Sequence, residues 1–293
     1  MNQIKGSITA LVTPFKDGRI DEDAFQKMVN IQVDAGTHAL VPVGTTGESA
    51  TLSDPEHERV VRLCVEAAAG RAPVIAGAGS NDTAYAISMA QRVQEFGADG
   101  ILAVTGYYNR PNQAGLIGHY EALHNATDMP IIIYNIPART TVSLSVETLA
   151  RLSELPRIVG VKDATADLAR VALQRIYCDA DFVQLSGEDM TAVGFNAMGG
   201  RGCISVASNV APAMCAQMQN ATLRGDFSAA LALQDRLAPL IDALFCDASP
   251  GPTKYALSLM GLCTNEVRLP MTPPSDAAKA KVRAALEGLG LID

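Results

Sequence analysis

The chain has 293 residues, of which 48% are hydrophobic, and its net charge is −8 without any cluster of lysine or arginine. Such a chain can bury a large core, and its scattered acidic charge does not suit a nucleic-acid backbone or an anionic membrane, so we expect neither as a partner. No segment approaches the roughly 18 to 20 apolar residues of a membrane span, and the start lacks an apolar stretch behind a basic flank, so we expect a cytoplasmic protein.

Short apolar runs rich in β-branched residues recur along the chain, and a turn and a longer alanine-rich amphipathic stretch follow each of them. The predicted strands cover residues 7–11, 39–43, 74–76, 100–104, 131–135, 158–162, 182–186 and 203–206. The predicted helices begin near Asp21, Pro55, Thr83, Gln113, Ser145, Asp167, Glu188 and Ala211. Eight repeats of strand and helix indicate an α/β fold, a (β/α)8 TIM barrel, for which about 250 residues is typical.

The strands stop after about Asn220, and helical spacing continues over residues 226–246, 252–262 and 275–289. We therefore predict a catalytic barrel over residues 1–224 and a small C-terminal α-helical domain over residues 225–293. A doubly wound open sheet is the structural alternative. It would usually need a glycine-rich phosphate turn after the first strand, which this sequence lacks.

The six cysteines are far apart and form no C-x-x-C pair, and no histidines stand at metal-ligand spacing. We therefore expect reduced thiols, no metal and no cofactor. The four histidines do not indicate a Ser-His-Asp arrangement either.

Lys162 ends an apolar predicted strand, and it is the only lysine between residues 28 and 253. Desolvation disfavours the charged form of a lysine, and a neutral amine is a nucleophile toward carbonyl groups. The alternative is a lysine that pairs with Asp163 or extends its amine to solvent. The local sequence leaves both interpretations open.

Reactive side chains follow several predicted strands, at the ends where barrel enzymes carry their chemistry. They lie in residues 44–49, 105–111, 134–140, 186–189 and 202–206, besides Lys162. A neutral lysine there could attack the ketone of a small keto acid, and the protonated imine would make the neighbouring methyl group acidic. Tyr134 with Thr45 and Tyr108 could relay protons, and Arg139 could hold a carboxylate, although a surface ion pair is equally open for this arginine.

Taken together, these segments resemble the dihydrodipicolinate synthase family, pyruvate-dependent class I aldolases within the N-acetylneuraminate lyase superfamily. The resemblance spans nearly the whole chain, through residues 6–14, 44–51, 107–111, 134–140, 160–165, 202–206 and 268–273. It implies a carbon–oxygen lyase that condenses pyruvate with L-aspartate 4-semialdehyde to 4-hydroxy-tetrahydrodipicolinate. That reaction belongs to lysine and diaminopimelate biosynthesis.

The resemblance also implies the catalytic residues. Lys162 would form the Schiff base with pyruvate, Tyr134 would donate protons, and Thr45 and Tyr108 would complete the relay. Because the family residue that matches Tyr108 reaches the active site of the neighbouring subunit, a homotetramer built as a dimer of tight dimers is implied.

Substrate-binding residues follow from the same resemblance. Thr46 and the backbone around Ile204 and Gly187 are implied to hold pyruvate, and Arg139 is implied to bind the carboxylate of the second substrate. Another pyruvate aldolase of the superfamily, such as N-acetylneuraminate lyase, is a rival interpretation. A barrel that binds a keto acid without turnover is a second rival, which fold alone does not exclude.

Family members that lysine inhibits bind it at a dimer interface. The matching positions here are Ser49, Ala50, His57, Gly79, Asn81, Tyr85 and Tyr107. Asp54 and Tyr85, however, stand where enteric members carry a histidine and a glutamate, and a phenol lacks the charge that would attract the ammonium of lysine. Gly106 is a second departure, because proline is common there, and glycine could loosen the relay loop.

We therefore predict that feedback inhibition by lysine is weakened or absent. Asp54 could partly compensate for the glutamate carboxylate that Tyr85 replaces. The measurement is the condensation rate during a titration with L-lysine. Inhibition at micromolar lysine would contradict the prediction.

Overall fold

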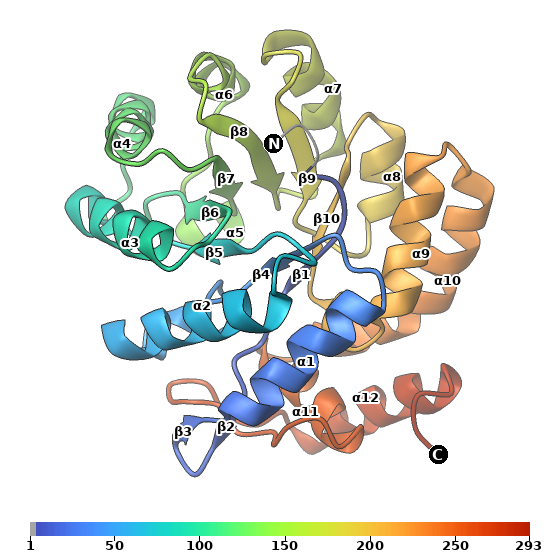
Figure 1. The fold of residues 1–293 in the computed structure, drawn as a ribbon. Coiled ribbons are helices and arrows are strands. Elements are labelled where there is room, and N and C mark those ends of the chain that lie inside the picture. Colours follow the sequence, from blue (N-terminus) through green and yellow to red (C-terminus); the bar gives the residue numbers. More distant parts are fainter. Residues whose placement is uncertain (1–3) are drawn as a thin grey trace.

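A closed barrel of eight parallel strands forms the centre of the computed structural model, which describes residues 4–293 (Figure 1). The strands lie in the order β4-β1-β10-β9-β8-β7-β6-β5, and a parallel bridge between Leu40 and Val74 joins β4 to β5. The sequence predicted all eight of them, and the predicted fold class is confirmed. Their bounds are β1 (Gly6–Ala10), β4 (Ala39–Val41), β5 (Ile75–Gly77), β6 (Gly100–Val104), β7 (Ile131–Asn135), β8 (Ile158–Asp163), β9 (Val183–Ser186) and β10 (Gly202–Ser205).

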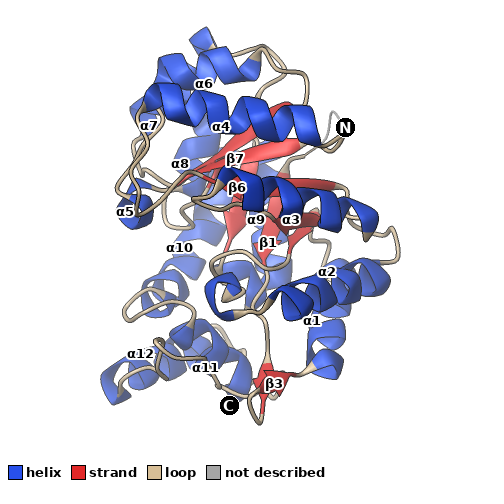
Figure 2. Ribbon diagram, turned by 90° about the vertical axis from the view of Figure 1, so that its left-hand side faces the viewer, coloured by secondary structure: helices blue, strands red, loops and turns tan. Residues whose placement is uncertain are grey.

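A helix follows each barrel strand and covers the outside of the barrel (Figure 2). These helices are α1 (Glu22–Asp34), α2 (Asp54–Ala68), α3 (Thr83–Glu95), α4 (Gln113–Ala126), α6 (Val146–Ser153), α7 (Leu168–Tyr177), α8 (Ala192–Ala197) and α9 (Pro212–Leu223). Several of these helices have an N-cap side chain that accepts a hydrogen bond from a backbone amide of the first turn. These N-caps are Asp21, Asn112, Ser145 and Asp167. Among the described residues, no helix is both long and apolar enough to cross a membrane.

Two features differ from the expected elements. A hairpin of β2 (Phe15–Lys16) and β3 (Arg19–Ile20) follows β1, and its two-residue strands are too short to give a periodic signal. Helix α8 begins at Ala192 instead of near Glu188. The residues before it are occupied in turn contacts, because the Ser186 hydroxyl donates to the Glu188 carbonyl and Asp189 accepts from backbone amides of the next loop.

Apolar side chains inside the barrel form a core separate from the one between strands and helices. The inner core contains Ile8, Val41, Ile75, Leu102, Ile132, Tyr134, Leu185 and Ile204. Alternate residues of each strand point inward, and the intervening residues pack against the helices. Tyr134 therefore belongs to the interior of the barrel, at the C-terminal end of β7.

The three helices predicted after the barrel are present as α10 (Phe227–Leu244), α11 (Gly251–Leu259) and α12 (Asp276–Gly288). Both ribbon views place α11 and α12 at one side of the barrel, near the β2/β3 hairpin (Figures 1 and 2). The proposed boundary at residues 224 and 225 falls between α9 and α10. One hydrophobic cluster extends from Leu11 to Leu286 across this boundary. We therefore propose that the barrel and the C-terminal helices differ in architecture but share one core.

Barrel closure depends on close backbone contact between β1 and β10. A Cβ atom at Gly202 would lie 2.3 Å from the Gly6 carbonyl oxygen and 2.4 Å from the Gly6 nitrogen. We expect Gly202→Ala to lower the free energy of unfolding by about 1–3 kcal/mol, because overpacking forces the backbone to move. Urea denaturation measures the change. Gly118→Ala is the matched control, since a Cβ atom added at this helical position would have no atom from outside its own helix within 4 Å. Equal destabilisation of both variants would contradict the prediction.

Candidate active site

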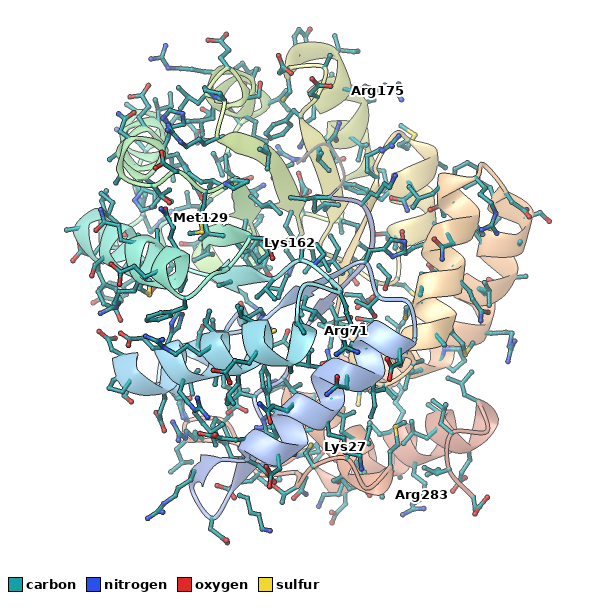
Figure 3. The ribbon with its side chains drawn as sticks, viewed as in Figure 1. Lys27, Arg71, Met129, Lys162, Arg175 and Arg283 are labelled. Atoms are coloured by element: carbon teal, nitrogen blue, oxygen red, sulfur yellow. The ribbon has the colours of Figure 1, made fainter. Side chains whose placement is uncertain are left out.

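Lys162 and Tyr134 lie side by side on neighbouring strands. They are partners in the register between β8 and β7, and the Lys162 amine lies 4.1 Å from the centre of the Tyr134 ring. Each residue is only 6% exposed. Figure 3 shows Lys162 near the middle of the barrel. The register therefore brings the two predicted catalytic side chains together.

Asp163 is not the partner of Lys162. Its carboxylate accepts from Arg170 Nε at 3.1 Å and Gln174 Nε2 at 2.8 Å, both on α7, and from the Thr165 hydroxyl at 2.6 Å. Successive residues of a strand point to opposite faces, so Asp163 packs against the outer helices. The alternative ion pair is wrong, and the Asp163 contacts anchor the end of β8.

Lys254 is a second buried lysine, and sequence reasoning missed it. It lies on α11 with no exposed surface, and its amine donates to Glu48 Oε1 at 2.5 Å. Within residues 4–293, the lysines in ion pairs are Lys254, Lys279 and Lys281, so no carboxylate lies within 4.0 Å of the Lys162 amine. The two buried amines therefore have different electrostatic surroundings.

A cavity of about 550 Å³ opens at the C-terminal ends of the strands. Of the predicted catalytic and substrate-binding residues, Thr45, Tyr134 and Arg139 line it. Lys162 is not among the described residues that line the cavity, but the Tyr134 ring that contacts its amine is. Residues of the C-terminal region complete the wall, and these are Ser249, Pro250, Pro270 and Met271.

The other predicted residues surround this cavity at different depths. Gly187 lies close to the lysine, because a Cβ atom there would be 3.2 Å from Lys162 Cε. Thr46 and Ile204 are buried, and Ile204 belongs to the inner core. Tyr108 is 91% exposed and lies outside the lining of the cavity, so a single chain does not bring it to Tyr134.

The turn that carries Thr45 and Thr46 is conformationally strained at both ends. Val43 and Glu48 have φ angles of 50° and 55°, in the left-handed region that non-glycine residues seldom occupy. Such residues cost about 1–3 kcal/mol each and persist only where the surroundings hold them. Gly77 allows close packing beneath the turn, because a Cβ atom there would be 2.3 Å from the Val43 carbonyl oxygen.

Asp189 connects the loops that follow β9 and β10. It is 3% exposed and accepts from the Val206 amide at 2.8 Å and the Ala207 amide at 3.2 Å. Burial raises the pKa of its carboxyl group, and the amide bonds act in the opposite direction. These bonds fix the backbone next to Ile204, a role that the sequence alone did not reveal.

The predicted effector positions share the same cavity. Ser49, Ala50, His57, Gly79, Tyr85 and Tyr107 line it, and Asn81 does not. The Tyr85 hydroxyl donates to Asp54, which also accepts from Arg92 Nη1 at 3.0 Å. These hydrogen bonds lower the pKa of Asp54, while burial lowers the pKa of His57. The Asp54 carboxylate is thus ionised but already bonded within the chain.

Comparison with known proteins identifies the family. The sequence model described as the Dihydrodipicolinate synthetase family matches residues 3–289. The chain belongs to this family. It is 59% identical over 99% of both chains to 4-hydroxy-tetrahydrodipicolinate synthase of Parvibaculum lavamentivorans, and 56% identical over 98% of both chains to the enzyme of that name from Phenylobacterium zucineum.

Solved structures agree with this assignment. Dihydrodipicolinate synthase from Aquifex aeolicus superposes with a TM-score of 0.97 at 42% identity, covering 98% of this chain and 99% of the other. The pyruvate complex of the chloride-inhibited Acinetobacter baumannii enzyme gives 0.97 at 41% identity, covering 99% and 100%. A monomeric dihydrodipicolinate synthase variant gives 0.97 at 38% identity, covering 98% and 97%.

Family membership confirms the predicted reaction class. The chain is a lyase-type aldolase of the class I, Schiff-base kind, and the family's synthase function in lysine and diaminopimelate biosynthesis is confirmed with it. The rival without turnover is therefore wrong.

Proposed function

We propose that the chain condenses pyruvate with L-aspartate 4-semialdehyde and that Lys162 forms the imine. One observation carries the choice of lysine. Among residues 4–293, no carboxylate lies within 4.0 Å of the Lys162 amine, which is buried beside an aromatic ring, whereas the amine of Lys254 is ion-paired. A Schiff base needs an amine that can lose its proton, and a salt bridge favours the charged form.

The chemistry follows from this placement. The Lys162 amine attacks the ketone carbon of pyruvate, and loss of water gives a protonated imine. Loss of a methyl proton produces an enamine, whose carbon attacks the aldehyde of the second substrate. Tyr134 is the proposed proton donor, because its ring lies 4.1 Å from the Lys162 amine and the residue lines the cavity. Thr45, which lines the same cavity, is the proposed next member of the relay.

Carboxylate recognition is assigned to two parts of the site. Thr46 with the backbone around Ile204 and Gly187 is proposed to hold pyruvate, which is supported by the close approach of Gly187 to Lys162. Arg139 lines the cavity from the short helix α5 (Pro137–Thr140) and is not among the arginines that form ion pairs in residues 4–293. Its guanidinium is therefore available for the carboxylate of L-aspartate 4-semialdehyde.

Assembly would complete the relay. Tyr108 is 91% exposed with a φ of 66°, and Tyr107 beside it is 38% exposed, which supports a loop that reaches a neighbouring subunit. Helix α7 exposes Leu173, Ile176 and Tyr177 and offers a second contact. We propose a homotetramer, a dimer of tight dimers, located in the cytoplasm.

Borohydride trapping tests the identity of the imine-forming residue. Reduction in the presence of pyruvate should add one pyruvate-derived mass to the Lys162 peptide, because borohydride reduces the imine to a stable amine. Lys162→Ala should abolish the adduct and leave the fold intact, as judged by circular dichroism. The Lys254 peptide is the internal control, and mass added there instead of at Lys162 would overturn the assignment.

Tyr134→Phe tests the proton relay separately from imine formation. The variant should still give the borohydride adduct, because the amine is unchanged. Its turnover should fall by about 10²- to 10⁴-fold, the usual effect of losing an acid–base group. Steady-state kinetics measure the loss, and full activity of the variant would remove Tyr134 from the relay.

A further inference from the structure

A buried ion pair joins the C-terminal helices to the threonine turn of the barrel. The Lys254 amine on α11 donates to Glu48 Oε1 at 2.5 Å, and the two side chains are 0% and 2% exposed. Glu48 Oε2 accepts from the backbone amide of Arg268 at 3.0 Å. The C-terminal region thus binds both oxygens of the carboxylate at the end of the turn.

Phe15 holds both cationic residues in place. Its buried ring lies 4.1 Å from the Lys254 amine and 4.3 Å from the Arg268 guanidinium. Arg268 also donates to the Thr51 carbonyl at 2.9 Å and to Glu56 Oε2 at 2.8 Å. The hairpin, helix α2 and the C-terminal segment therefore fix the groups that hold Glu48.

Glu48 has a backbone that needs such support. Glu48 ends the turn with a φ of 55°, and its amide donates to the Thr45 carbonyl at 3.1 Å, which connects its backbone directly to Thr45. A left-handed non-glycine residue persists only where its surroundings hold it. Around the Glu48 side chain, the holding groups are Lys254 and the Arg268 amide.

Stability alone is a weak reason for this pair. A buried ion pair must offset the desolvation of two charges, and replacing such pairs with apolar residues is often neutral or stabilising. Charged hydrogen bonds do, however, restrict direction and distance more strictly than apolar contacts. Orientation of the turn is thus the better explanation for a buried charge at this place.

We propose that Glu48 and Lys254 are positioning residues, through which the C-terminal domain sets the conformation of the Thr45–Thr46 turn and so the affinity for the keto-acid carboxylate. This inference rests on the proposed role of that turn in holding pyruvate. Neither residue is proposed to touch the substrate.

The test uses the full-length chain with Lys254→Met, which keeps the buried volume and removes the charge. The readout is the pyruvate concentration that gives half of the maximal borohydride adduct at Lys162, together with kcat and KM. We expect this concentration and the KM for pyruvate to rise by about tenfold or more, because small displacements of positioning groups have large effects. The kcat should fall by a smaller factor.

Leu257→Ala is the matched control, since Leu257 is fully buried on the same helix but carries no charge. It should lower the melting temperature and leave the pyruvate dependence unchanged, which separates positioning from stability. If Lys254→Met only lowers the melting temperature and keeps the pyruvate dependence of the unaltered chain, the inference is overturned while the proposed function stands.

Two further outcomes are decisive. If Lys254→Met does not fold, the double variant Glu48→Gln with Lys254→Met, which leaves no unpaired charge, should fold and should still need more pyruvate; an unchanged requirement would overturn the inference. If the unaltered chain gives no adduct at Lys162, the proposed function fails, and this inference fails with it.

Discussion

Closure of the eight-stranded sheet is the constraint on which the site depends. Once the Leu40–Val74 bridge joins the last pair of strands, every strand is parallel to its neighbours, and all the C-terminal ends meet in one ring. Closure also requires positions without a side chain. Gly160 and Gly202 allow this, because a Cβ atom at either would lie within 2.4 Å of a neighbouring backbone atom. At this ring of strand ends, the register between β7 and β8 brings Lys162 and Tyr134 into contact.

The two buried lysines have different electrostatic surroundings. At Lys254, desolvation lowers the pKa while Glu48 acts in the opposite direction. Lys162 lies against a phenol ring instead of a carboxylate. Within residues 4–293, the chain therefore holds one buried amine in a structural ion pair and places no carboxylate within 4.0 Å of the other, and the family's Schiff-base chemistry needs an amine that can lose its proton.

The C-terminal region forms part of the wall of the cavity at the strand ends. Ser249, Pro250, Pro270 and Met271 line that cavity, and Lys254 and Arg268 bond to the loop on its other side. This arrangement connects the region after the barrel directly to the loop that follows β4. It also explains why one hydrophobic cluster crosses the proposed boundary, since a loosely attached domain would hold neither the wall nor the turn in place.

The sequence by itself determined the eight strands, the helices around them and the family. Strand alternation, helical spacing and turn motifs are all local properties of the chain, so they can be recognised without the structure. It also indicated Lys162, Tyr134, Thr45 and Arg139 as residues at strand ends. Only the tertiary structure decided which charged group each buried carboxylate meets. Asp163 is adjacent to Lys162 in sequence but binds α7, while Glu48 and Lys254 are 206 residues apart and form a buried pair. Such pairing depends on strand register and barrel closure, which bring distant residues together without leaving a local pattern.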